Sequence, residues 1–258
     1  MKNKMYLLIQ LTKKDIALRY KGSVLGLLWS FITPLLSLAV YTVVFSVVFQ
    51  ARWNLQTESK GMFALILFGG LLVINMENEI LQRSVTLIAS NVNYVKKVIF
   101  PLEILPIMVT LSALFTALIS MVLLILANLF FQRTILATTW MLPLIFIPYV
   151  CMSIGISYIV SAISVYLKDM ASFITILMML LMYTSPVFYS LEMIPSQLVF
   201  VCKLNPLTYI IENVRNVSLL NTGMNWKYWL ISFVIGGVLL LAGQKIFRRL
   251  REGFADVL

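Results

Sequence analysis

Histidine is absent from this 258-residue chain, and charged residues make up only 12% of it. Without histidine, the chain has no imidazole to bind a metal ion or to act as a general acid or base. Soluble domains usually carry about 25% charged residues, whereas 61% of this chain is hydrophobic and its mean hydropathy is +0.96. One soluble core could not enclose so much apolar surface. We therefore expect an integral membrane protein.

Sequence motifs for nucleotide binding are also missing. The chain contains no G-x-x-x-x-G-K-[ST] loop and no glycine-rich dinucleotide turn, so it has no recognisable phosphate cradle. No charged residue is expected near the centre of a span, where proton-coupled transporters usually keep one; Glu77 and Glu79 are expected near the cytoplasmic end of the second span. We predict that the chain is not an enzyme and holds no cofactor or metal. Any energy for uphill transport then comes from another subunit.

Long uncharged runs predict an all-α membrane protein with six transmembrane helices. A spanning helix needs about 20 apolar residues, and the longest runs without Asp, Glu, Lys or Arg cover 22–51, 104–132 and 134–167. The predicted spans are 28–50, 62–82, 104–131, 140–166, 171–190 and 228–247. Cys151 and Cys202 are expected to be unpaired packing residues.

The distribution of basic residues predicts the orientation in the membrane. With six spans, the two termini and two loops share one side, which carries 14 of the 20 Lys and Arg residues. The other side carries Arg52, Lys60, Arg133, Lys203, Arg215 and Lys227. Because positive loops remain in the cytoplasm, both termini are predicted to be cytoplasmic. The net charge of +10 flanks the spans and does not gather on a soluble domain, so we expect contact with membrane lipids and none with nucleic acid.

Three segments outside the spans have amphipathic or broken patterns. Residues 1–22 place Met5, Ile9, Ile16 and Tyr20 on one face beside lysines, which is typical of a helix lying on the membrane surface. Residues 83–100 repeat an apolar residue at 3-4-3-4 spacing and predict a cytoplasmic helix that either docks on a partner or lies on the membrane. The outward segment 191–227 holds two short apolar pieces, each preceded by proline, which are candidates for re-entrant or interfacial helices or for a lipid-facing loop.

Six segments, taken in this order along the chain, carry a resemblance to a known family: LTKKDIALRYKGSVLGLLWSFITPL (11–35), NVNYVKKVIFPLEILP (91–106), YLKDMASF (166–173), SPVFYSLEMIP (185–195), LNPLTYIIENVRN (204–216) and FRRLREGFADVL (247–258). They resemble the membrane permeases of type-2 ABC transporters, specifically those that export O-antigen and related polysaccharides. The resemblance covers essentially the whole chain and implies one permease domain over 1–258 in a bacterial inner membrane.

The resemblance also implies parts and partners. It implies an interface helix at 1–22, a gate and coupling region at 83–100 and re-entrant helices within 191–227. The functional unit would be two copies of this chain with two copies of a separate ATPase, which would hold ATP and Mg. The residues expected at or beside the ATPase are Lys96, Lys97, Phe100, Glu103, Lys168 and Asp169.

A pore for a sugar polymer needs hydroxyl and aromatic side chains, because unpaired sugar hydroxyls are costly in an apolar medium. A polar-to-aromatic stripe on the first span and rings near the outer end of the fifth fit this need. The proposed pore residues are Ser30, Thr33, Ser37, Tyr41, Phe45, Phe49, Tyr183, Phe188 and Tyr189. The alternative interpretation is ordinary helix packing and interfacial aromatic belts.

Other functions remain open at this point. Within the ABC transporter interpretation, the substrate could be capsular polysaccharide, teichoic acid or a small molecule. A passive channel or secondary transporter would need no ATPase. A membrane-embedded glycosyl- or acyltransferase would need polar catalytic groups, and the scarcity of Asp and Glu together with the lack of His argues against it.

Overall fold

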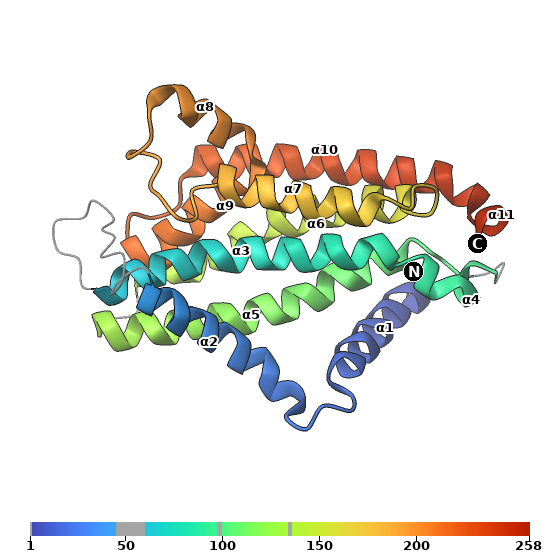
Figure 1. Ribbon diagram of the computed structural model, residues 1–258, viewed down its shortest axis with the longest axis horizontal. Helices are drawn as coiled ribbons and strands as arrows, with labels where there is room; N and C mark the ends of the chain where they lie inside the picture. The colour runs from blue at the N-terminus through green and yellow to red at the C-terminus, as the bar shows by residue number, and fades with distance from the viewer. Residues whose placement is uncertain (1, 45–59, 97–99, 134–135) are drawn as a thin grey trace.

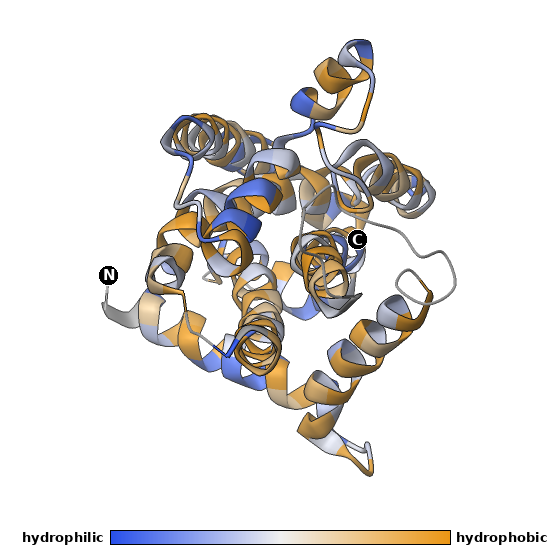
Figure 2. Ribbon diagram, turned by 90° about the vertical axis from the view of Figure 1, so that its left-hand side faces the viewer, coloured by the Kyte–Doolittle hydropathy of each residue, from blue (hydrophilic) through white to orange (hydrophobic). Residues whose placement is uncertain are grey.

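The computed structural model describes residues 2–44, 60–96, 100–133 and 136–258, and every regular element within these ranges is a helix (Figure 1). The α-helices are α1 (Lys2–Tyr20), α2 (Trp29–Tyr41), α3 (Lys60–Thr86), α4 (Val92–Val95), α5 (Ile104–Gln132), α6 (Leu142–Ile163), α7 (Met170–Thr184), α8 (Ser196–Leu204), α9 (Pro206–Arg215), α10 (Trp226–Leu250) and α11 (Phe254–Val257). Figure 2 views the bundle nearly end-on and shows predominantly hydrophobic residues along its helices. The prediction of an all-α protein is confirmed for the residues that the structure describes.

Five helical segments are long and apolar enough to cross a bilayer. They are Gly26–Val44, Gly61–Thr86, Ile104–Phe131, Ala137–Ile163 and Trp226–Val257. The predicted fifth span, 171–190, corresponds to α7, which has only 15 residues and is about 22 Å long. It ends because Ser185 precedes Pro186 and is extended, with φ −92° and ψ 151°, as residues before proline prefer. The six-span count therefore stays a prediction.

Helix α3 is the centre of the bundle. It packs against α2, α5, α6, α7 and α9, and 83% of its most apolar window is buried, compared with 6% for the segment that contains α2. The main core joins α3 residues such as Leu71, Val73 and Ile80 to Ile145 and Tyr149 of α6. Helix α2 thus lies at the edge of the bundle.

Helices α6 and α10 have the closest backbone packing. Gly155 of α6 lies against Gly243 of α10, and Pro148 lies against Gly236 in the same way, seven residues earlier on each helix. The contact seven residues further along α6 is also seven residues further along α10, so the two helices run parallel to each other. Small residues at both levels let the backbones approach, and a Cβ at Gly243 would collide with the Gly155 carbonyl.

The connecting segments gather at two opposite ends of the bundle (Figure 1). One end carries both termini, α4 and α11, and the other carries α8 and α9. Helix α1 lies oblique to the bundle (Figure 1) and packs mainly on α5. Leu8 and Leu11 of α1 contact the protein. On the predicted apolar face, Met5 and Ile9 are exposed, whereas Ile16 and Tyr20 are partly buried.

The continuous amphipathic helix predicted over 83–100 is wrong. Helix α3 extends to Thr86, a turn and a short 3₁₀ helix (Ala89–Asn91) follow, and α4 covers only Val92–Val95. Residues 97–99 lie outside the described residues. The chain breaks at Asn91, which has φ −119° and ψ 29° and whose side chain donates to the Leu87 carbonyl at 2.8 Å. This side-chain bond offers the backbone an alternative to the helix, which a count of apolar spacing does not register.

Segment 191–227, which the sequence predicts to face outward, forms the two predicted short helices, and the second is inserted into the bundle. Helix α9 packs on α3, α6 and α10, while α8 projects away from the bundle (Figure 1). Asn205 joins α9 to α7: its side chain accepts from Leu207 N at 3.0 Å at the start of α9, and it donates to the Leu181 carbonyl at 2.8 Å at the end of α7.

Candidate functional site: a polar face between α2, α3 and α7

The inner half of α3, toward the end with the termini, carries a stripe of exposed polar side chains. Asn75, Asn78 and Gln82 follow one another at three- and four-residue spacing and are exposed, so they lie on one face of the helix. Leu71 and Ile74, one turn earlier, are buried. The stripe is therefore confined to the inner half of a helix that is otherwise apolar and covered.

On one side of this stripe, a cavity of about 470 Å³ separates α3 and α5 from α2. Ser30, Thr33, Ser37 and Tyr41, the predicted pore residues of the first span, all line it from α2. Hydroxyl and amide groups line the opposite wall, namely Asn75, Thr116 and Ser120. The structure thus brings these four α2 residues together, facing the chain's own bundle, whereas Leu35, Leu36 and Val40 on the outer face of α2 are exposed.

On the other side of the stripe lies α7. The Gln82 amide donates to Thr175 Oγ1 at 3.4 Å, which links the inner ends of α3 and α7. Further out, Tyr183 is 58% exposed and its ring centroid lies 6.4 Å from that of Phe188. Tyr189 is turned toward the α7 terminus, where its hydroxyl donates to the Tyr183 carbonyl at 2.8 Å.

Aromatic side chains cover the outer part of the same face. Tyr41 of α2 and Phe188 both pack against the cluster built around Phe63 and Leu67 of α3. Two rings from different segments thus meet the buried half of α3, beyond the polar stripe. The predicted pore residues Phe45 and Phe49 lie outside the described residues.

An ion-pair network, which we call the α1–α3 clamp, joins Asp15 and Arg19 of α1 to Glu79 and Arg83 of α3. Arg83 donates to both oxygens of Asp15, at 2.6 and 2.7 Å, and Arg19 lies 2.5 Å from Glu79. The local i,i+4 pair Glu79–Arg83 is present at 3.6 Å, but the shorter contacts run between helices. Arg19 and Glu79 also line the α2 cavity, so the clamp bounds its inner end.

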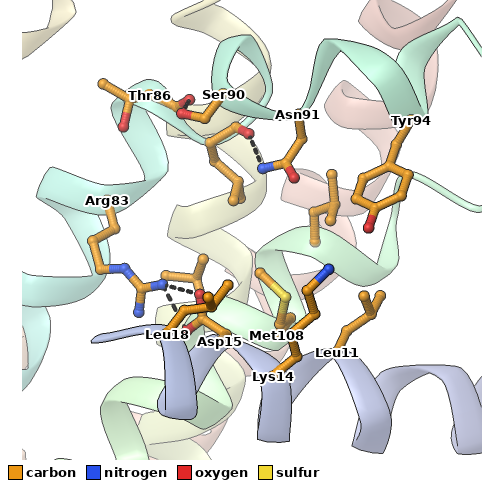
Figure 3. A pocket seen from close by; sticks show the side chains of 13 residues that line it. Leu11, Lys14, Asp15, Leu18, Arg83, Thr86, Ser90, Asn91, Tyr94 and Met108 are labelled. Atoms are coloured by element: carbon orange, nitrogen blue, oxygen red, sulfur yellow. Dashed lines mark hydrogen bonds and ion pairs between the residues drawn. The ribbon is translucent and has the colours of Figure 1, made fainter. Parts of the chain in front are cut away.

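A second cavity of about 320 Å³ lies beyond the clamp, between α1, α5 and the segment 86–94 (Figure 3). Figure 3 shows Lys14, Asp15 and Leu11 on α1 below, and Ser90, Asn91 and Tyr94 on the turn and α4 above. The break in the predicted 83–100 helix forms the upper wall of this cavity. The position of α4 relative to α1 therefore depends on the side chains around this space.

Glu77 occupies a position that the sequence analysis did not anticipate. Its side chain is fully buried and accepts a hydrogen bond from Ser153 of α6 at 2.6 Å. Because α3 continues to Thr86, Glu77 lies about 13 Å from the helix end, deeper than predicted. It contributes to the α3–α6 contact and does not line either cavity.

The residues expected to contact an ATPase lie at the end with the termini. Lys96, Lys168 and Asp169 are exposed, and Phe100 stacks on Tyr94 with a centroid distance of 4.3 Å. Glu103 is engaged within the chain, since its carboxylate pairs with Arg248 at 3.0 Å and Arg251 at 3.4 Å. Lys97 lies outside the described residues.

Arg215 of α9 anchors the inserted segment at the outer end. Its guanidinium is buried and donates to the Ile66 carbonyl of α3 at 2.9 Å, to the Val187 carbonyl at 2.8 Å and to the Pro186 carbonyl. One side chain therefore holds α9, α3 and the loop after α7 together. That loop bears Phe188, so the outer aromatic cover depends on Arg215.

The polar face offers hydrogen bonding and ring stacking, and within the described ranges no group of three or more His, Cys, Asp or Glu residues gathers to hold a metal. The predicted pore residues Ser30, Thr33, Ser37 and Tyr41 lie across the cavity from Asn75, whereas Tyr183, Phe188 and Tyr189 lie further out, at the end of α7. The stripe of Asn75, Asn78 and Gln82 was not predicted from the sequence. Their helical spacing inside a spanning segment was the available signal.

Comparison with known proteins places this architecture in a family. The family model for the ABC-2 type transporter matches residues 6–219. Two proteins from Klebsiella pneumoniae, both named O-antigen export system permease protein RfbA, are 30% and 29% identical over 253 residues, covering 98% of this chain and 95% of each relative. A protein of the same name from Myxococcus xanthus is 26% identical over 255 residues, covering 97% and 94%. The chain belongs to the ABC-2 type transporter family of membrane permeases.

Proposed function

We propose that this chain forms half of the channel of an ABC exporter, which moves lipid-linked O-antigen polysaccharide across the bacterial inner membrane. The observation that carries the proposal is the exposed stripe of Asn75, Asn78 and Gln82 within a spanning helix. Polar side chains inside a membrane segment are costly against lipid and usually face water or protein. A second copy of the chain, placed opposite this face, would enclose the stripe in a pore.

The chemistry around the stripe supports a sugar as cargo. Hydroxyls of Ser30, Thr33 and Ser37 and the amide of Asn75 line the α2 cavity and can exchange hydrogen bonds with a hydroxyl-rich chain. Aromatic faces give a sliding sugar broad contacts with little directional preference. The outer rings of Tyr41, Tyr183 and Phe188 would supply such contacts where the polymer leaves the inner half of the face.

The proposed topology has six spans and two cytoplasmic termini. In it, α7 serves as the remaining span, α1 lies along the cytoplasmic surface, and α9 re-enters from the outer side. Support comes from the basic residues, because Arg248, Arg249 and Arg251 stand at the end of the bundle that also holds the N-terminus (Figure 1). A cytoplasmic location of that end follows the distribution of positive charge.

A separate ATPase would supply the energy, with ATP and Mg bound on that partner. The proposed docking surface comprises Lys96, Lys97, Phe100, Lys168 and Asp169. Two copies of the ATPase would approach each other when ATP binds, and the clamp between α1 and α3 would pass that motion to the polar face. ATP shifts the transporter toward one state only because it binds the two states differently.

Reconstitution of the chain in proteoliposomes, alone and with its ATPase, tests the proposal. The vesicles contain O-antigen linked to its carrier lipid, and export is read as polymer that becomes accessible to a glycosidase on the far side. We expect export only with ATPase and ATP together. Export by the chain alone, or by the complex without ATP, would contradict the proposal.

Parallel vesicles loaded with lipid-linked capsular polysaccharide or teichoic acid separate the related substrate classes. Export of one of these in place of O-antigen would support the role as an ABC permease and contradict the proposed O-antigen substrate. Transfer of a sugar or acyl group without translocation would instead indicate a membrane-embedded transferase.

A further inference from the structure

Residues 247–258 lie at the end of the bundle that carries both termini and are anchored there by two buried rings, Phe247 and Phe254. We call them the C-terminal strut. Phe254 is fully buried. Its ring lies 5.6 Å from that of Phe247 and 6.1 Å from that of Tyr166, between centroids.

The strut is bound to the segment just before Lys168 and Asp169. The Tyr166 hydroxyl donates to the Leu250 carbonyl at 2.7 Å. Gly253 sits against the same hydroxyl, and a Cβ at this position would lie only 2.5 Å from it. Tyr166 is thereby fixed on both sides by backbone of the strut, and the short α6–α7 turn that follows is held with it.

The strut is also bound to the segment that follows Lys96. The Glu103 carboxylate lies between Arg248 and Arg251. The main chain at the same residue is held separately, because the Tyr158 hydroxyl donates to the Glu103 carbonyl at 2.9 Å, and the Tyr158 ring packs on Phe247 at 5.3 Å. Side chain and backbone of Glu103 are therefore both tied to one unit.

We propose that the C-terminal strut joins the two proposed cytoplasmic contact regions into a single rigid unit that transmits the motion of the ATPase. In the described residues these regions are Lys96 with 100–103, and 166–169. Phe254, Arg248 and Arg251 are its positioning residues. The inference rests on the proposed function, in which these regions seat the ATPase. The sequence segment FRRLREGFADVL, one of the six that carry the family resemblance, thereby acquires a mechanical role.

The variant that disturbs the strut most is found by comparing how much each contact stabilises it. Arg248 and Arg251 have side chains that are 57% and 42% exposed, and ion pairs in such positions contribute little on their own. Phe254 is entirely buried, and removal of its ring leaves a cavity that the neighbouring rings fill only in part. Phe254→Ala should therefore loosen the strut more than loss of either arginine.

The first experiment measures the strut in the chain itself. Spin labels are placed at Lys96→Cys and Lys168→Cys, in a background with Cys151→Ser and Cys202→Ala, and the full chain is reconstituted in lipid nanodiscs. We expect one narrow distance distribution, broadened at least twofold by Phe254→Ala and unchanged by Val257→Ala, which alters an exposed residue of the same helix. Equal widths for both variants would overturn the inference.

The second experiment measures coupling in the complex with its ATPase. In Phe254→Ala, we expect the ATPase to copurify at the normal ratio and the number of ATP molecules hydrolysed per exported polymer to rise at least threefold. A purely structural role would lower export and hydrolysis in proportion, and an unchanged ratio would overturn the inference. If Phe254→Ala does not fold, the double variant Arg248→Gln/Arg251→Gln takes its place. A smaller rise is then expected, because these ion pairs are exposed, and no rise at all would overturn the inference.

The two experiments separate this inference from the proposed function. The distance measurement requires no ATPase and no polymer, so a narrow distribution that Phe254→Ala broadens supports the strut even if the wild-type complex exports nothing. Conversely, the complex could export polymer while Phe254→Ala changes neither the spin-label distances nor the ATP hydrolysed per polymer. That result would support the proposed function and overturn the inference.

Discussion

Asp15 of α1 accepts two hydrogen bonds from Arg83 of α3, at 2.6 and 2.7 Å, and this pair fixes the oblique first helix to the centre of the bundle. Ser112 of α5 donates to the same carboxylate at 2.5 Å. Three helices therefore meet at one side chain. Because Arg19 and Glu79 stand one turn away from this contact and bound the α2 cavity, movement of α1 and access to the polar face are linked.

Asp15→Asn should loosen α1 by weakening these charge-assisted bonds. We expect a loss of about 1–2 kcal/mol in the free energy of unfolding, together with faster tryptic cleavage after Lys13 and Lys14. The exposed carboxylate of Asp256 offers a matched control, and Asp256→Asn should leave both measurements unchanged. Equal cleavage rates in the two variants would show that the α1–α3 clamp does not hold α1 on the bundle.

The packing of α6 on α10 predicts opposite effects for two glycines of one helix. Gly243→Ala should force the helices apart and lower stability by about 1–3 kcal/mol, because its Cβ would meet the Gly155 carbonyl. Gly237 has open space around it, so Gly237→Ala should raise stability by up to about 1 kcal/mol through helix propensity. Unfolding in graded detergent mixtures measures both, and the same sign for both would contradict the packing.

Arg215→Met should be among the most damaging substitutions at the outer end. It removes the side-chain donor from three carbonyls in a buried place, those of Ile66, Pro186 and Val187, at a cost of about 3–5 kcal/mol. Arg215→Lys should recover only part of this, because an ammonium group cannot reproduce the planar fork of a guanidinium. Thermal unfolding ranks the stability of the wild type, Arg215→Lys and Arg215→Met. Full recovery of stability in Arg215→Lys would show that the positive charge alone matters.

Asn205 predicts a further effect at the junction of α7 and α9. Asn205→Leu removes the cap of α9 and the donor to Leu181 together, and should cost about 1–3 kcal/mol. Asn205→Asp should retain the cap and lose the donor, and should cost less. Proteolysis of the 191–227 segment from the outer side provides the measurement, and indistinguishable cleavage in both variants and wild type would contradict it.

Local chemistry made part of this structure predictable. Runs of apolar residues located the five long helices, and the prolines at 195 and 206 marked the starts of α8 and α9. The helix boundary at Thr86 was not predictable in this way, because Val85, Ile88 and Val92 keep helical spacing across a chain that turns between them. Periodicity reports the buried face and does not report a break in the backbone.

The site was harder to predict than the fold, because its residues are selected by tertiary contacts. The stripe on the first span contains the residues that line the α2 cavity, yet their direction toward the chain's own bundle follows from how α2 leans on α3 and α5. From the sequence, Arg215 was interpreted only as a positive charge in an outward loop. In the structure it is buried and donates to three carbonyls from other segments. Asn75, Asn78 and Gln82 have a spacing that places them on one helix face, but the sequence does not show that this face is left uncovered.

The accessibility of α3 tests the central claim most directly. Single cysteines at positions 75, 78 and 82, in a background with Cys151→Ser and Cys202→Ala, are exposed to a charged, membrane-impermeant thiol reagent in the assembled transporter. The account predicts rapid modification at these three positions and none at Ile80 or Leu81, which are buried and line neither cavity. Protection of all three stripe positions would place them against lipid or protein, and the polar face would then not be the channel.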